Sequence, residues 1–192
     1  MHARGICIVG LVLLVSTAVH PQGQAEAITE PEAYAVYAAL MPKLEPARAT
    51  GASRLVIQAE SVTNPKCGLK GKPLEEEWRG VIDDFNRENA RVRRILPNFP
   101  TMGLPFRVVE SAEIESALAV NGWPGFYAVF PDTGGYYRVS AVGFNQEKTW
   151  AMVYIEYGCG NLCGGGRHSL LEKRDGQWVD AKVDVEICSW IS

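Results

Sequence analysis

The last third of the chain constrains the fold most, because it consists of strand patterns separated by turn signals. Stretches rich in β-branched and aromatic residues predict strands over 136–144, 149–157, 167–174 and 179–187. The turn signals between them include Asn145–Lys148 and Asp175-Gly176, and the Asp-Gly pair is typical of a two-residue hairpin. In the last strand Val179, Ala181 and the following odd positions alternate with charged side chains. We expect a four-stranded antiparallel β-meander with one solvated face.

Helix patterns precede this meander. Residues 74–96 carry apolar side chains at three- and four-residue spacing, and Pro97 follows, so we predict a long helix from Leu74 to Leu96. Asn89 lies on its apolar stripe and is interpreted as a hydrogen-bonded structural amide. A helix over 31–41 follows from Thr29 as its cap and Pro31 in its first turn. A shorter helix over 111–120 would be capped by Ser111 and stopped by Gly122.

Two further strands are predicted over 54–60 and 106–110. The expected fold is therefore one α+β domain over residues 28–192. In it an antiparallel β-meander packs one face against one long helix and one or two short helices.

Residues 1–27 have the pattern of a secretory signal peptide. They begin with His2 and Arg4, continue through the apolar run 6–19, and end in Ala25-Glu26-Ala27. The apolar run has 14 residues, fewer than the roughly 20 that a membrane-spanning helix needs. An uncleaved anchor is the alternative. We expect cleavage after Ala27, a secreted or periplasmic protein, and no stable membrane insertion afterwards.

Removal of this segment from the 192 residues leaves 165, and it reduces five cysteines to four and three histidines to one. The single histidine, His168, cannot supply the imidazoles of most catalytic zinc sites, so we expect no metal and no cofactor. An exported chain with four cysteines favours disulfides. Cys159 with Cys163 is the favoured pair because they are close in sequence, which leaves Cys67 for Cys188; the other pairings remain open.

The chain carries 19 basic and 22 acidic side chains, a formal charge of −3. This balance argues against a nucleic-acid partner, which would require a basic face.

The glycine-rich segment 158–166 is interpreted as a loop pinned by a disulfide, with a redox dithiol or a thiolate metal site as alternatives. A phosphate cradle is excluded because a strand follows the segment where a helix would be needed. His168, beside these glycines, is expected to be an exposed residue at the edge of the loop.

Two other groups of side chains could carry function. Trp123, Phe126 and Tyr127 form an aromatic segment that is either a ligand-binding surface or a plug at one end of the core. The acidic row Asp180, Asp184 and Glu186 could join Glu156 across the meander as paired carboxylates for hydrolysis. On an alternating strand the simpler interpretation is that these charges face water. We expect no catalytic residue.

The C-terminal block resembles a group of uncharacterised exported bacterial proteins. The likeness rests on Gly143-Phe144-Asn145, on Cys159-Gly160-x-Leu162-Cys163-Gly164-x-Gly166, and on Leu170-Leu171-Glu172-Lys173 with Asp175-Gly176-Gln177-Trp178. It implies a bacterial exported protein and brings no known activity. In that block an aromatic residue would be expected in place of His168. The strand order also resembles, distantly, the cone-shaped fold of nuclear transport factor two and the ketosteroid isomerases.

These patterns predict a non-enzymatic, disulfide-stabilised binding module of the bacterial cell envelope, whose partner is a small molecule or another envelope protein. The alternative is a periplasmic or exterior hydrolase that uses carboxylates.

Overall fold

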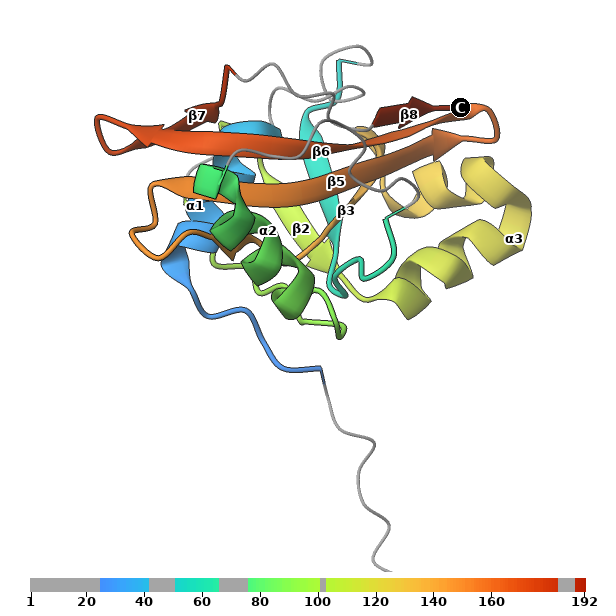
Figure 1. Cartoon of the computed structure of the whole chain (residues 1–192). Helices are drawn as coiled ribbons and strands as arrows, with labels where there is room; N and C mark the ends of the chain where they lie inside the picture. The colour runs from blue at the N-terminus through green and yellow to red at the C-terminus, as the bar shows by residue number, and fades with distance from the viewer. Residues whose placement is uncertain (1–24, 42–50, 66–75, 101–102, 183–188) are drawn as a thin grey trace, which may run out of the picture.

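The chain folds around one open, mostly antiparallel β-sheet with three helices in its described part (Figure 1). The computed structural model describes residues 25–41, 51–65, 76–100, 103–182 and 189–192. The helices are α1 (Pro31–Leu40), α2 (Glu76–Glu88) and α3 (Ser111–Val129). The strands are β1 (Arg54–Gln58), β2 (Phe106–Val109), β3 (Thr133–Val139), β4 (Gly143–Phe144), β5 (Trp150–Gly160), β6 (Cys163–Arg174), β7 (Gln177–Asp180) and β8 (Ser189–Ile191). The expected α+β class is confirmed. None of the described helices is long and apolar enough to span a membrane.

The sheet is larger and more mixed than the predicted meander. Its strand order is β2-β1-β3-β5-β6-β7, with β4 paired to β5 and β8 paired to β6. The steps from β3 to β7 are antiparallel as expected, whereas β1 runs parallel to both β2 and β3. Parallel pairing needs a connection that crosses the sheet, and the segments containing α2 and α3 provide it. The predicted strand 136–144 is two strands, β3 and β4.

Both faces of the sheet are covered, so the prediction of one solvated face is wrong. In Figure 1, α1 lies behind β5 and α2 lies in front of it. The odd-numbered side chains of β1, β3 and β5, among them Ile57, Val139 and Ile155, join the core of α1. The even-numbered side chains face α2 or α3, as Met152 and Val56 do. Because β1 is buried on both faces, its three central residues, Leu55, Val56 and Ile57, are all apolar and do not alternate with polar ones.

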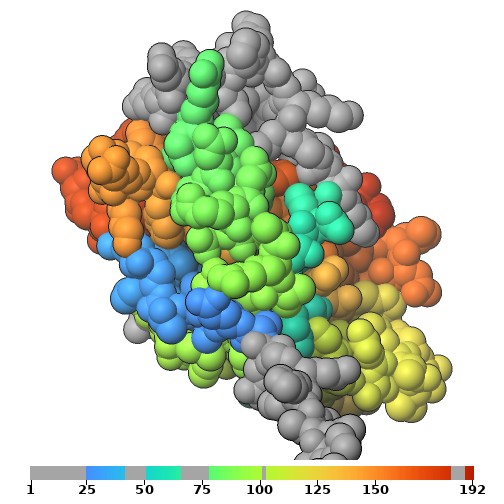
Figure 2. Space-filling view, turned by 60° about the horizontal axis from the view of Figure 1, so that its bottom comes forward, coloured from blue at the N-terminus to red at the C-terminus, as the bar shows by residue number. Residues whose placement is uncertain are grey.

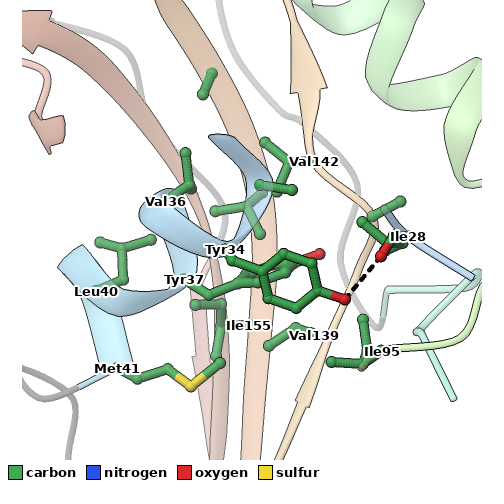
Figure 3. Close-up of a cluster of buried hydrophobic side chains, with 14 of the residues drawn as sticks. Ile28, Tyr34, Val36, Tyr37, Leu40, Met41, Ile95, Val139, Val142 and Ile155 are labelled. Atoms are coloured by element: carbon green, nitrogen blue, oxygen red, sulfur yellow. Dashed lines mark hydrogen bonds between the residues drawn. The ribbon is translucent and has the colours of Figure 1, made fainter. Parts of the chain in front are cut away.

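Helix α1 is close to its predicted length and is held by two buried tyrosines (Figure 3). The Tyr34 hydroxyl donates to the carbonyl of Ile28 at 2.8 Å, and the Tyr37 hydroxyl donates to the carbonyl of Ser140 at 2.7 Å. Burial raises the pKa of both phenols, that of Tyr37 most strongly. Each hydroxyl therefore stays protonated and acts as a neutral hydrogen-bond donor within the apolar core.

The N-terminal cap of α1 differs from the prediction. Glu30, not Thr29, is the cap residue, and no side chain bonds there. Glu32, in the first turn of α1, accepts hydrogen bonds from Lys173 at 2.7 Å and from the Trp178 indole at 2.8 Å. The Lys173 hydrogen bond, followed by that of Trp178, lowers the pKa of Glu32 despite opposing desolvation. The tertiary contact to β6 and β7 thus replaces the local cap.

The long helix 74–96 is wrong at its C-terminal end. Helix α2 ends at Glu88, and the chain then runs extended, with the Ile95 amide donating to the Ala59 carbonyl at 2.7 Å. Ile95 is buried in the core of α1, and Val92 is 42% exposed. The predicted stripe over Trp78, Val81 and Phe85 does face the sheet. Of the later positions with this spacing, Val92 is exposed and Leu96 packs against the core of α1.

Helix α3 begins with Glu110 as its cap, not with Ser111 as expected. The Ser111 hydroxyl instead bonds the Glu60 carboxylate at 2.5 Å. The predicted stop at Gly122 holds as a kink: Gly122 has a φ of 59°, and the chain then resumes a second helical stretch to Val129. That stretch carries the aromatic segment.

The glycine-rich segment 158–166 is not the predicted loop. It forms the end of the long β5–β6 hairpin, in which Gly158 pairs with Gly164 and only residues 161–162 make the turn. Cys159 and Cys163 are bridged across this turn, as the spacing predicts. Cys67, Cys188 and Asp184 lie outside the described residues. At the other end of β6, Asp175 and Gly176 have positive φ angles of 50° and 76° and form the predicted hairpin turn.

Candidate functional site

The candidate site is a recess on the face of the sheet that α2 and α3 cover, at the end where β5 and β6 turn. It is a cavity of about 250 Å³ that we call the sheet recess. Its lining consists of Tyr136, Arg138, Glu156, Tyr157, Gly158, Gly160, Asn161, Cys163, Gly164, Trp190 and Ser192. These residues come from β3, the β5–β6 hairpin and the C-terminal end of the chain.

The recess is hollow because glycines replace side chains along its floor. On this face the successive cross-strand pairs are Tyr154 with His168, Glu156 with Gly166, and Gly158 with Gly164. Side chains two positions apart share a face, so at Gly164 and Gly166 strand β6 contributes no side chain to this face, and Trp190 lies against both glycines. A Cβ on Gly166 would lie 2.5 Å from both the Tyr154 hydroxyl and the Trp190 indole nitrogen. Glycine at 166 is therefore required by the close approach of these two polar groups.

A partly buried ion pair lies on the floor of the recess. Arg138 and Glu156 are directly opposite each other on β3 and β5, and Nη1 of Arg138 donates to Oε1 of Glu156 at 2.6 Å. The Glu156 side chain is 7% exposed, whereas that of Arg138 is 37% exposed and reaches the cavity. Nε of Arg138 is buried and has no hydrogen-bond partner. The guanidinium thus retains hydrogen-bonding capacity that the protein does not use.

A chain of hydrogen bonds orients the carboxylate from its other side. The Trp190 indole donates to the Tyr154 hydroxyl at 2.8 Å, and that hydroxyl donates to Oε2 of Glu156 at 2.9 Å. Each oxygen of Glu156 therefore has a partner, as a carboxylate removed from water requires. The same bonds hold the indole of Trp190 in place beside Gly164.

The predicted aromatic segment lies behind one wall of the recess. Trp123 stacks on Tyr136 with ring centroids 6.0 Å apart and an interplanar angle of 19°. Phe126 is fully buried, and the Tyr127 hydroxyl donates to the carbonyl of Cys159 at 2.9 Å. None of the three is among the residues that line the cavity. Their contacts anchor α3 to the disulfide end of the hairpin and support Tyr136.

His168 is not the exposed residue that was expected. It is 2% exposed, on the strand position opposite Tyr154, with its ring 4.8 Å from that of Tyr154 and 5.6 Å from that of Phe85. Burial lowers its pKa to about 4, and its Nδ1 atom has no hydrogen-bond partner. The imidazole is therefore neutral near pH 7 and packs as an aromatic ring.

The predicted acidic row does not converge on the recess in the described residues. Asp180 pairs with Leu171, whose side chain belongs to the core of α1, so Asp180 projects from the opposite face of the sheet from Glu156. The Asp180 side chain is 50% exposed and lies 3.7 Å from Arg167. Among the described residues that line the recess, Glu156 is the one with a carboxylate side chain.

A second, larger cavity of about 560 Å³ lies between α2, the segment before α1 and the β4–β5 turn. Figure 2 shows α2 in green across this face, with the N-terminal segment in blue beside it. Its charged side chains pair with one another: Arg87 with Asp84, Arg93 with Glu88, and Lys148 with Glu30. No polar group in its described lining is buried without a partner. For this reason the sheet recess is the better candidate.

Sequence reasoning missed Arg138, Tyr154 and Trp190. A usable signal exists in hindsight: Arg138 and Glu156 are charges within otherwise apolar or aromatic strand patterns. Glycines at 158, 160, 164 and 166 also continue the two-residue period of the strands through the turn.

Comparison with known proteins gives no match: no family model, no curated protein and no solved structure matches the chain.

Proposed function

We propose that this chain is an exported, disulfide-stabilised, non-enzymatic binding module of the bacterial cell envelope, and that it holds a small molecule in the sheet recess. The proposal depends most on the Arg138–Glu156 pair, which is built into the cavity floor with a guanidinium that retains unused donors. Ligand pockets typically combine a small number of fixed polar groups, like this pair, with apolar walls. Tyr136 and Trp190 supply the walls here.

The resemblances noted in the sequence are part of the same proposal. The resemblance of the C-terminal block to exported bacterial proteins supports export. The distant likeness to the cone-shaped fold of nuclear transport factor two rests on the antiparallel half of the sheet, from β3 to β7. The hydrolase alternative has less support, because Glu156 and Asp180 project from opposite faces.

The test is a thermal-shift screen of the exported protein against a panel of metabolites and glycans. We expect at least one compound to raise the Tm of the native protein and to lose this effect in the double variant Arg138→Met, Glu156→Gln. The double change removes both charges together, so it leaves no lone buried charge. Asp180→Asn, on the opposite face, is the matched control and retains the shift.

A panel without any stabilising compound would count against a small-molecule function and favour a protein partner. A compound that stabilises native and double-variant protein equally would show that the ligand binds outside the recess.

A further inference from the structure

The floor of the sheet recess presents a donor and an acceptor side by side. Of the five N–H bonds of the Arg138 guanidinium, one is directed to Glu156, and the buried Nε has no partner. Glu156 accepts one bond on each oxygen, from Arg138 and from Tyr154, and a carboxylate can accept about four. The buried Nε is out of a ligand's reach, but the Arg138 side chain is 37% exposed and both residues line the cavity, so the outer N–H groups and the carboxylate can bond a ligand without breaking the ion pair.

The charges of this pair cancel, which bears on the class of ligand. A ligand carboxylate attracted by Arg138 would lie against Glu156, and a ligand ammonium attracted by Glu156 would lie against Arg138. A hydroxyl group can both donate and accept, so two neighbouring hydroxyls match the pair without any unfavourable charge contact.

The walls favour a ligand with apolar faces. Tyr136 and Trp190 both line the cavity, and both rings are held from behind: Tyr136 by Trp123, and Trp190 by its bond to Tyr154. Aromatic faces carry partial negative charge and attract C–H groups that carry partial positive charge. Gly158 and Gly164 add no side chains of their own to the lining, and the aromatic rings pack directly against them: Trp123 and Tyr136 against Gly158, and Trp190 against Gly164.

We infer that the recess binds a single neutral sugar ring, with two adjacent hydroxyls on Arg138 and Glu156 and its C–H face against Trp190 or Tyr136. This inference rests on the proposed binding function and names its ligand class. The cavity of about 250 Å³ is below the usual range for drug-sized ligands, roughly 300–1,000 Å³. It therefore suits one ring of a monosaccharide or the end of a glycan.

The experiment follows the indole N–H signals of the exported, isotope-labelled protein by NMR. Glucose, galactose, mannose and N-acetylglucosamine are the sugar probes; cyclohexanol, benzoate and alanine are the comparison compounds. Trp190→Phe identifies the Trp190 signal. We expect at least one sugar to shift that signal in a saturable manner, while the Trp150 signal, from the region packed on α2, stays in place.

Variants test whether sugar binding depends on the Arg138–Glu156 pair. The double variant Arg138→Met, Glu156→Gln should weaken sugar binding at least tenfold, whereas Asp180→Asn should leave it unchanged. Cyclohexanol has the ring without the neighbouring hydroxyls, so weak or absent binding of cyclohexanol is expected.

Three results would overturn the inference. If benzoate or alanine shifts Trp190 and no sugar does, the sugar assignment fails and the binding function stands. If sugars bind equally to the double variant, they bind elsewhere. If no compound in this panel or in the thermal-shift panel acts through the recess, the proposed function fails as well.

Discussion

At the scale of single residues, the buried polar side chains show how tertiary surroundings decide a role. Asn89 and Glu156 are 7% and 5% exposed, and each has hydrogen-bond partners for its side-chain oxygens. His168 is buried to the same degree, but its Nδ1 has no partner. An unsatisfied polar atom in a core costs stability. An aromatic residue, which the resemblance leads one to expect at this position, would avoid that cost.

His168→Phe should therefore change how stability depends on pH. Burial lowers the pKa of His168 to about 4 in the folded protein, against about 6.5 in the unfolded chain. As pH falls from 6.5 to 4, the unfolded chain binds a proton that the folded protein does not, so stability falls by up to about 3 kcal/mol. The Phe variant lacks this component. Urea unfolding of both proteins at several pH values measures the difference.

At pH 8 both side chains are neutral, so the difference there contains no protonation component and serves as the reference. Equal losses of stability on acidification in the two proteins would contradict the prediction.

At the scale of elements, side chains from α2 and from the turn that follows it bond the backbone on either side of β4, in the place that a neighbouring strand would take. The Asn89 side chain accepts from the amide of Ala141 at 2.8 Å and donates to its carbonyl at 3.0 Å. Asp84 accepts from the amide of Phe144 at 2.7 Å. These bonds satisfy backbone groups that lie beyond the reach of β5. They also position α2 above the sheet.

Asn89→Leu tests this role. The variant keeps a side chain of similar size but leaves the N–H and C=O of Ala141 without their partner in a buried site. We expect a loss of about 2–3 kcal/mol in the free energy of unfolding. Asn86→Leu, an exposed position on the same helix, is the matched control and should change stability by no more than about 0.5 kcal/mol. Similar losses in both variants would contradict the role of Asn89.

At the scale of the whole molecule, the proposed signal peptide ends where the folded core begins. Ile28 is 5% exposed, its amide donates to the carbonyl of Arg94, and its carbonyl accepts from Tyr34. Cleavage after Ala27 would keep the Tyr34 hydrogen bond and leave Ile28 an amine that can still donate to Arg94, but it would remove the hydrogen bond from the Arg94 amide to the carbonyl of Glu26.

Expression of the full chain in a bacterial host should thus yield a periplasmic protein that begins at Ile28. N-terminal sequencing and intact mass of the periplasmic fraction measure this, and alkylation without reduction should leave Cys159 and Cys163 unmodified. Recovery of the uncut chain from the membrane fraction would support an anchor in place of a signal peptide.

Much of the secondary structure could be predicted because it depends on local pattern. Pro31, Gly122 and the Asp175-Gly176 pair act through their own backbone preferences, so the start of α1, the kink in α3 and the last hairpin turn were predictable. The bridge between Cys159 and Cys163 was predictable because the two residues are close in the sequence. The glycines of 158–166 misled, because glycine is equally typical of a loop and of a bare strand.

The sequence by itself therefore determined the positions of many elements, the α+β class and the Cys159–Cys163 disulfide, since these follow from neighbours in the chain. Only the tertiary structure decided the rest. β1 lies between β2 and β3 and parallel to both, and helix α1 covers one face of the sheet while α2 and α3 cover the other. The pairing of β3, β5, β6 and β8 brings Arg138, Glu156 and Trp190 together. These contacts join residues far apart in the chain, and no local pattern encodes the register that aligns them.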